Sequence, residues 1–246
     1  MTEPRWAALT RDEVRERARS ARVAVLPVGA TEQHGPHLST GTDTLLGERI
    51  ALAAVGRTGD VLLPALAYGC SLGHTDAWPG TVSLHPATMT AVVIEIGRWV
   101  HASGFRRLVI LNSHATNGPP CQSAILQLRY ELPDLRLRFV STFDLSPSIF
   151  ARFTQDAPDL HANEAETSLM LRLEPDQVRM ELAVDEPDRT VGRVFQYQMP
   201  PVSRSGVVGS PTTATEPAGA ELFEQLVGAL VELLEAAGTE TDPDLG

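Results

Sequence analysis

Hydrophobic positions along the chain follow two alternating patterns, short continuous apolar runs and longer stretches with helical spacing. Residues 23–26 (VAVL) and 108–111 (LVIL) are continuous runs, which are typical of strands buried on both faces. Further strands are expected at 61–66 and 135–140, and helices at 44–55, 87–102, 122–131 and 164–173. Because parallel neighbours need a return connection, this alternation predicts an α/β fold with a mostly parallel central sheet covered by helices.

The two ends of the chain carry further helical patterns. Thr10 and Glu13 have the spacing of a capping box, which predicts a short first helix. A last helix that docks on the core is predicted by an apolar stripe of Leu222, Phe223, Leu226, Val227, Leu230 and Leu233. Residues 191–213 have no period and are rich in Pro, Gly and Ser, so we expect either a lid over a site or a subunit contact. We expect one domain over residues 1–238 and a disordered acidic tail over 239–246.

Composition narrows the class of protein. The chain has 246 residues and a formal net charge of −11, so it lacks the basic stripe that binds nucleic acid. Its two cysteines, Cys70 and Cys121, have no framework spacing, which suits a reducing compartment. The first residues lack the apolar core of a signal peptide, and no apolar stretch has the length of a membrane span. We therefore expect a cytoplasmic protein with no nucleic-acid or membrane partner.

Metal-ligand chemistry is concentrated in TEQHGPHLSTGTDT, residues 31–44, directly after the first predicted strand. Glu32 and His34 are two residues apart, so in extended chain their side chains point to the same side. Asp43 follows nine residues later, across a loop whose Pro and Gly residues allow it to fold back. Carboxylates together with imidazole suit Zn²⁺ or Mn²⁺, and a carboxylate can bridge two ions. The alternative is a loop in which these side chains only bond to the backbone.

Other candidate ligands follow later strands. Ligands bind beyond the carboxyl ends of strands in open α/β sheets, and His114 lies directly after the strand at 108–111. The alternative for His114 is a core histidine satisfied by a neighbour. Glu164 and Glu166 open a predicted helix and point to different faces, so only one of them faces this edge of the sheet. Carboxylates also occur in the first turn simply because the helix dipole favours them.

The loop GCSLGHTDAWPGTVS, residues 69–83, is the third segment expected at this edge. It carries His74 and Trp78, and we expect the indole to cover a bound ligand. The alternative is that Trp78 fills a surface gap beside Pro79.

Four motifs, in this order along residues 22 to about 174, together resemble the creatininase (creatinine amidohydrolase) family. They are Glu32-Gln33-His34-Gly35 with Asp43, Trp78-Pro79-Gly80-Thr81, Asn112-Ser113-His114-Ala115-Thr116-Asn117, and Glu166-Thr167-Ser168. The resemblance implies a three-layer α/β/α fold with a dinuclear metal site. It also implies a homo-oligomer, a hexamer in the family.

The resemblance also implies roles for particular residues. One divalent ion would be held by Glu32, Asp43 and His114, and the other by His34, Asp43 and Glu166. Asp43 would then bridge the ions, which are expected to be Zn²⁺, with Mn²⁺ or Fe²⁺ as alternatives, and a hydroxide between them would be the nucleophile. His161 corresponds to a family histidine that moves a proton to the leaving nitrogen. Contact with the substrate is expected from His74, Trp78, Thr116 and Glu164.

Departures from the family pattern bear on the substrate. Thr116 stands where creatininases have a catalytic Glu, so creatinine itself is not the expected substrate. We expect a metal-dependent amidohydrolase that cleaves a C–N bond in another small, cyclic or open amide. One alternative is a peptidase of the mycofactocin-maturation type. Peptidases of that type tend to lack the proline of the Trp78-Pro79-Gly80-Thr81 motif, so Pro79 argues mildly against this alternative. Another is a non-catalytic binding or scaffold protein. A dinucleotide-binding enzyme is set aside, because no G-x-G-x-x-G follows the first strand.

Overall fold

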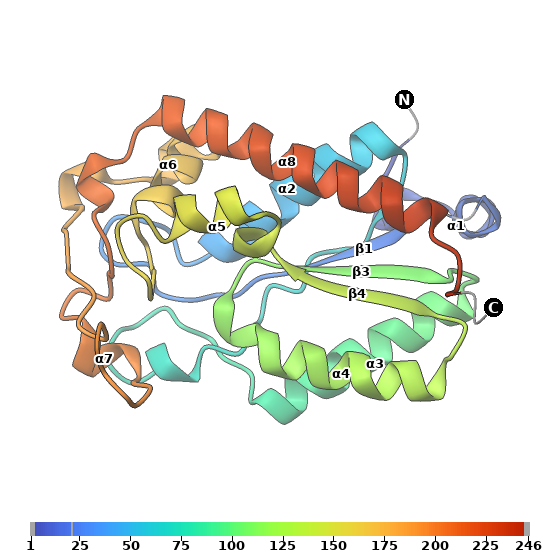
Figure 1. Cartoon of the computed structure of the whole chain (residues 1–246), viewed down its shortest axis with the longest axis horizontal. Helices are drawn as coiled ribbons and strands as arrows, with labels where there is room; N and C mark the ends of the chain where they lie inside the picture. The colour runs from blue at the N-terminus through green and yellow to red at the C-terminus, as the bar shows by residue number, and fades with distance from the viewer. Residues whose placement is uncertain (1–2, 21, 244–246) are drawn as a thin grey trace.

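A parallel β-sheet forms the middle layer of the molecule. The computed structural model describes residues 3–20 and 22–243. Four parallel strands are hydrogen-bonded in the order β2-β1-β3-β4, and Figure 1 shows β1, β3 and β4 between two layers of helices. Their bounds are Ala24–Val28 for β1, Val61–Leu62 for β2, Arg107–Asn112 for β3 and Arg136–Ser141 for β4. The expected α/β class with a parallel sheet is confirmed.

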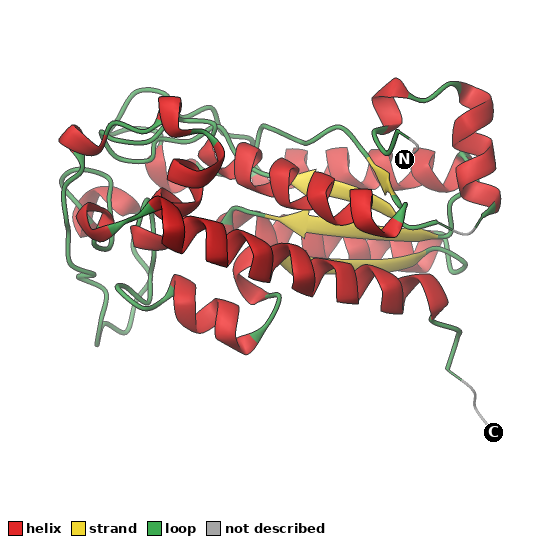
Figure 2. Cartoon of the chain, turned by 90° about the horizontal axis from the view of Figure 1, so that it is seen from above, coloured by secondary structure: helices red, strands yellow, loops and turns green. Residues whose placement is uncertain are grey.

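Helices cover both faces of the sheet. Figure 1 shows α2, α5, α6 and α8 on one face and α3 and α4 on the other, and Figure 2 shows the long helices running along the strands. The α-helices are α1 Arg11–Arg19, α2 Thr42–Thr58, α3 Pro86–Ala102, α4 Gly118–Glu131, α5 Pro147–Phe153, α6 Glu164–Leu173, α7 Met199–Val202 and α8 Glu216–Thr239. Short 3₁₀ helices lie at Trp6–Ala8, Leu72–His74, Ala115–Asn117, Thr142–Asp144, Pro175–Gln177, Met180–Leu182 and Pro211–Thr213. The three-layer α/β/α arrangement is therefore confirmed.

Alternate residues of each central strand enter different cores. In β1, Val25 packs into the core under α2 and α8, whereas Leu26 packs into the core above α3 and α4. In β3, Val109 packs into the core under α2 and α8, and Ile110 packs into the core above α3 and α4. Both faces of these strands are buried, which explains why the sequence shows continuous apolar runs there.

Most of the predicted elements are present, with three differences. The strand expected at 61–66 is hydrogen-bonded as a regular strand only over Val61–Leu62, because Pro64 has no N–H to donate to the sheet. Helix α5 was not expected from the apolar pattern. Residues 191–213, expected to be irregular, contain α7 and a short bridge between Val208 and His161. Within the described residues, no helix is both long and apolar enough to cross a membrane.

The residues that come after α8 are held by Arg136. Residues 240–243 have no regular secondary structure, and the side chain of Arg136 bonds to the backbone carbonyl of Glu240 and to Asp242. The remainder of the expected tail, residues 244–246, lies outside the described residues. The domain bounds 1–238 stay a prediction.

Helix α8 lies directly on α6 at one glycine. A Cβ built at Gly219 would lie 1.8 Å from the backbone oxygen of Ser168, so only hydrogen fits there. Gly228, on the same helix, has nothing within 4 Å of a built Cβ. The close approach buries α6 against the core, and α6 carries Glu166 in its first turn.

Gly219→Ala is expected to lower the free energy of unfolding by about 2 kcal/mol or more, because the added methyl group has to push α8 away from α6. The matched variant Gly228→Ala is expected to raise it by up to about 1 kcal/mol, since alanine favours helix and space is available. Chemical denaturation of both variants measures the difference. Equal stabilities would show that the α6–α8 contact is not tight.

Candidate metal centre

The loop after β1 folds back so that Glu32, His34 and Asp43 meet. The backbone N–H of Glu32 donates to the carbonyl of Thr40 at 2.8 Å, which closes the loop. Gly35 has φ 64°, and a Cβ there would lie 2.4 Å from Val207, so this turn requires glycine. Asp43 lies in the first turn of α2. The loop therefore brings two carboxylates and an imidazole to the carboxyl end of β1.

Two further segments deliver His114 and Glu166 to the same place. His114 follows β3, and the hydroxyl of Ser113 before it donates to the backbone oxygen of Asp43 at 2.7 Å. Asn163 caps α6 by accepting the backbone N–H of Glu166 at 3.2 Å. Glu166 is thus fixed in the first turn of the helix, where negative charge is favoured.

Asp43 lies between the two histidines and presents one oxygen to each. Its Oδ1 lies 3.1 Å from Nε2 of His34, and its Oδ2 lies 3.2 Å from Nδ1 of His114. The other nitrogen of His114 lies 3.2 Å from Oε2 of Glu32. A carboxylate with one oxygen toward each of two ligand groups has the arrangement of a bridging ligand.

The five residues Glu32, His34, Asp43, His114 and Glu166, called the ligand cluster below, form two overlapping groups. Glu32, Asp43 and His114 offer ligand atoms within 4.8 Å of one another, and so do His34, Asp43 and Glu166. The neighbouring His161 forms a further such group with Glu32 and His34. All five residues are buried, with at most 7% of their surface exposed. Both oxygens of Glu32, Oδ2 of Asp43 and Oε2 of Glu166 have no hydrogen-bond partner. Buried carboxylate oxygens without partners are costly, and divalent cations would satisfy them, so the cluster fits a metal pair.

The pKa values of the residues in the ligand cluster also fit metal binding. Burial lowers the pKa of His34, but the adjacent Asp43 carboxylate outweighs this and raises it to about 10. Burial is likewise outweighed at His114, whose pKa rises to about 9 beside Glu32 and Asp43. Burial raises the pKa of Glu166 to about 7 and that of Glu32 above its ordinary value. Without cations the cluster therefore holds protons, and metal binding would replace them.

Gln33 holds two more histidines beside the cluster. Its Oε1 accepts the N–H of Gly35 at 2.9 Å, so its Nε2 donates to the carbonyl of Gly206 and to Nδ1 of His74, at 3.1 and 3.0 Å. The backbone carbonyl of Gln33 lies 2.8 Å from Nε2 of His161, which must donate to it. Nδ1 of His161 is therefore the nitrogen that faces the cluster, 3.5 Å from Oε1 of Glu32.

A cavity of about 180 Å³ opens over the cluster. His74, Thr116 and His161 line it, as do Glu32, Asp43, His114 and Glu166. The rest of the described lining is mainly apolar or small and comprises Ser113, Ala115, Phe143, Phe150, Thr154, Pro158, Asp159, Leu160 and Met199. A substrate entering this cavity would meet the ligand cluster at its floor.

Two residues expected to contact substrate lie outside this cavity lining. The carboxylate of Glu164 is bonded by the Arg152 guanidinium, which lowers its pKa against the effect of burial, and by the hydroxyl of Ser168 at 2.7 Å. Trp78 is half-buried in the loop before Pro79. Substrate contact by Glu164 and Trp78 stays a prediction.

The sequence patterns did not indicate several residues of the site. Gln33 stands between two ligands, and its role depends on Gly206, 173 positions later, where a Cβ would collide with the Gln33 amide. Phe150 and Met199 reach the cavity from α5 and α7, neither of which has a recognisable apolar period.

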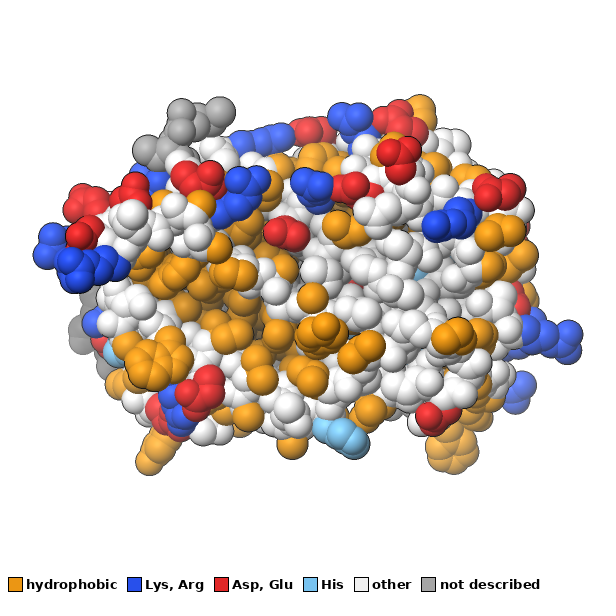
Figure 3. All heavy atoms as spheres, turned by 180° about the vertical axis from the view of Figure 1, so that it is seen from behind, with side chains coloured by type: hydrophobic (Ala, Val, Ile, Leu, Met, Phe, Trp, Pro, Cys, Tyr) orange, Lys and Arg blue, Asp and Glu red, His pale blue; other side chains and the backbone are white. Residues whose placement is uncertain are grey.

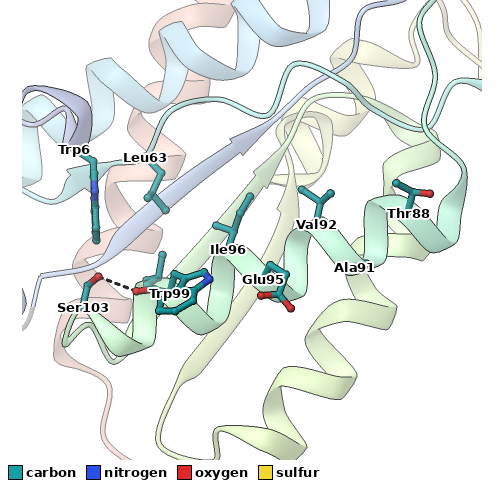
Figure 4. A pocket seen from close by; sticks show the side chains of 10 residues that line it. Trp6, Leu63, Thr88, Ala91, Val92, Glu95, Ile96, Trp99 and Ser103 are labelled. Carbon is teal, nitrogen blue, oxygen red and sulfur yellow. Dashed lines mark hydrogen bonds between the residues drawn. The ribbon is translucent and has the colours of Figure 1, made fainter.

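A larger groove of about 520 Å³ runs along α3, away from this chemistry. Hydrophobic side chains gather around a hollow on the face seen in Figure 3, and Figure 4 shows the groove lined by Trp6, Leu63, Val92, Ile96 and Trp99. Among the described residues of its lining, Glu95 is the one ionisable group. The groove has no set of metal ligands and does not compete with the cluster as a catalytic site.

Comparison with known proteins gives relatives over most of the chain. The mycofactocin precursor peptide peptidase of Mycolicibacterium smegmatis is 31% identical over 223 residues, covering 87% of this chain and 84% of the relative. The creatinine amidohydrolase of Pseudomonas putida is 31% identical over 229 residues, covering 86% and 88%.

Solved structures agree with these relatives. A crystal structure of creatinine amidohydrolase matches with a TM-score of 0.89 and 31% identity, covering 98% of this chain and all of that one. Other matching creatininase structures, each 30% identical with a TM-score of 0.86, are described as a Zn-Zn type and as a Mn form, and each match covers at least 97% of this chain and all of the other. The family model for creatinine amidohydrolase matches residues 7–234, so the chain belongs to the creatininase family.

Proposed function

We propose that this family hydrolase uses two divalent ions per chain, Zn²⁺ in the first place and Mn²⁺ or Fe²⁺ as alternatives, to cleave a C–N bond in a small amide other than creatinine. The observation that carries the proposal is the pair of overlapping ligand groups that share Asp43. Creatininase structures described with Zn or Mn support the choice of ion.

The residues divide the chemistry between them. When bound, the two ions would supply a water that ionises near neutral pH and positive charge for the attacked carbonyl oxygen. Asp43 would fix the spacing between the ions through its two oxygens. Burial lowers the pKa of His161 well below its ordinary value, so its ring is uncharged at rest. Its Nδ1 would accept a proton released by the attacking water and pass it to the leaving nitrogen.

Thr116 supports a substrate other than creatinine. Its hydroxyl lies 2.6 Å from Nε2 of His114 and contacts the backbone carbonyl of Cys70, so it is held against the cluster. A threonine hydroxyl brings no negative charge and cannot serve as a carboxylate base. Chemistry that needs a glutamate at this position is therefore not expected here.

Peptide cleavage is the second candidate, because the mycofactocin peptidase is as similar to this chain as the creatinine amidohydrolase is. Pro79 in the loop 69–83 favours the small-amide assignment mildly. A non-catalytic scaffold is disfavoured, since all five ligand residues are present and buried together.

Compartment and assembly also stay proposals. Cys70 and Cys121 are both free thiols in the structure, which fits the proposed cytoplasmic setting. A homo-oligomer, hexameric by family resemblance, would bury apolar surface such as the groove along α3.

Metal analysis of three variants tests the proposed site. Wild type loaded with Zn²⁺ and desalted is expected to hold about two ions per chain. Asp43→Asn removes the shared charge and is expected to lose both ions, whereas Glu166→Gln is expected to lose about one. Glu164→Gln is the matched control, since Glu164 is bonded to Arg152, and it is expected to keep both ions.

Elemental analysis counts the ions, and thermal unfolding shows whether each variant is folded. The proposal is wrong if folded Asp43→Asn retains the wild-type metal content. It is equally wrong if Glu164→Gln loses as much metal as Glu166→Gln.

A substrate panel of small cyclic and open amides beside short peptides tests the reaction. We expect hydrolysis of a small amide, and His161→Gln is expected to reduce kcat roughly a hundredfold or more while metal content stays unchanged. Hydrolysis of peptides alone would favour the second candidate. Full activity in His161→Gln would contradict the assigned proton transfer.

A further inference from the structure

The cavity has an apolar wall beside the ligand cluster. Five lining residues, called the apolar wall here, form it: Phe143, Phe150, Pro158, Leu160 and Met199. They come from the segment between β4 and α6 and from α7, so two separate parts of the chain contribute to it. None of these side chains can bond to a polar group of a substrate.

The charges of the residues that line the cavity favour a substrate group that carries no charge. Among the described residues that line it, none is arginine or lysine. Arg152, close by on α5, is bonded to Glu164 and so is not available. Asp159 is the one acidic residue of the described lining outside the cluster. A carboxylate on the substrate would find no fixed cationic side chain along the described wall, and Asp159 would repel it.

Phe150 shows that the wall is not simply core. This residue is 48% exposed although it belongs to a cavity lining, while Phe153, on the same helix, is buried. A half-exposed aromatic residue in the lining of a cavity has apolar surface available for a ligand.

We propose that the apolar wall binds an uncharged aromatic or branched aliphatic group attached next to the scissile amide. The substrate class is then neutral amides with an apolar neighbouring group, and amides with a carboxylate at that place are excluded. The inference rests on the proposed function, because the metal pair would hold the amide against the wall.

Hydroxamates test this without a known substrate, since the hydroxamate group chelates metal and its side group then reports on the wall. Three probes are titrated calorimetrically into the full-length protein loaded with Zn²⁺: acetohydroxamate, phenylacetohydroxamate and the monohydroxamate of succinate. Phenylacetohydroxamate is expected to bind roughly tenfold or more tightly than acetohydroxamate, because burial of an apolar group is favourable. The succinate probe is expected to bind more weakly than acetohydroxamate.

Two variants place the effect at the wall. Phe150→Arg puts a cation at a half-exposed position and is expected to reverse the order of the phenyl and succinate probes. Met199→Ala shortens the wall without charge and is expected to weaken only the phenyl probe, by about threefold or more. Tyr130→Arg is the matched control, because Tyr130 is 88% exposed on α4 and is not part of the lining, and it is expected to leave all three affinities unchanged.

The outcomes separate this inference from the proposed function. Equal affinity for the phenyl and succinate probes, or an unchanged order in Phe150→Arg, overturns the apolar wall while the metal site stands. Failure of all three probes to bind, acetohydroxamate included, overturns the metal site and the wall with it.

Discussion

Three buried carboxylates gathered around two buried histidines are the constraint on which this structure depends. Glu32, Asp43 and Glu166 carry oxygens with no hydrogen-bond partner. Against the effect of burial, Asp43 raises the pKa of His34, and Glu32 together with Asp43 raises that of His114. Such a cluster is costly in a folded protein unless cations compensate it. The molecule retains it at the end of its central strands, where the fold is best able to hold side chains in fixed positions.

The surrounding architecture serves to bring distant residues to one point. The loop after β1 closes on itself through the Glu32–Thr40 hydrogen bond, and β3 ends two residues before His114. Helix α6 delivers Glu166 from its capped first turn and is held in place by α8 at Gly219. The candidate ligands therefore come from the loop after β1, from the segment after β3 and from the first turns of α2 and α6. This rigidity is what a metal pair with a fixed spacing requires.

The sequence predicted the parts of the fold that repeat and the parts of the site that form compact motifs. Continuous apolar runs identified β1 and β3, because both faces of these strands are buried. The short motif around Glu32 and His34 indicated candidate metal ligands, and the structure brings their side chains together with Asp43, His114 and Glu166. The role of Gln33 was not predicted, because its contact with Gly206 joins residues far apart in the sequence. Phe150 was not predicted, because α5 is too short to show a helical period. Glu164 and Glu166 could not be distinguished by spacing, and only the position of Arg152 shows that Glu164 is engaged elsewhere.

Anomalous diffraction from crystals grown with Zn²⁺ tests the central claim most directly. The account predicts two peaks within the ligand cluster, one on each side of Asp43, with Glu32 and His114 at one peak and His34 and Glu166 at the other. A single peak, or ions bound away from Asp43, would contradict it.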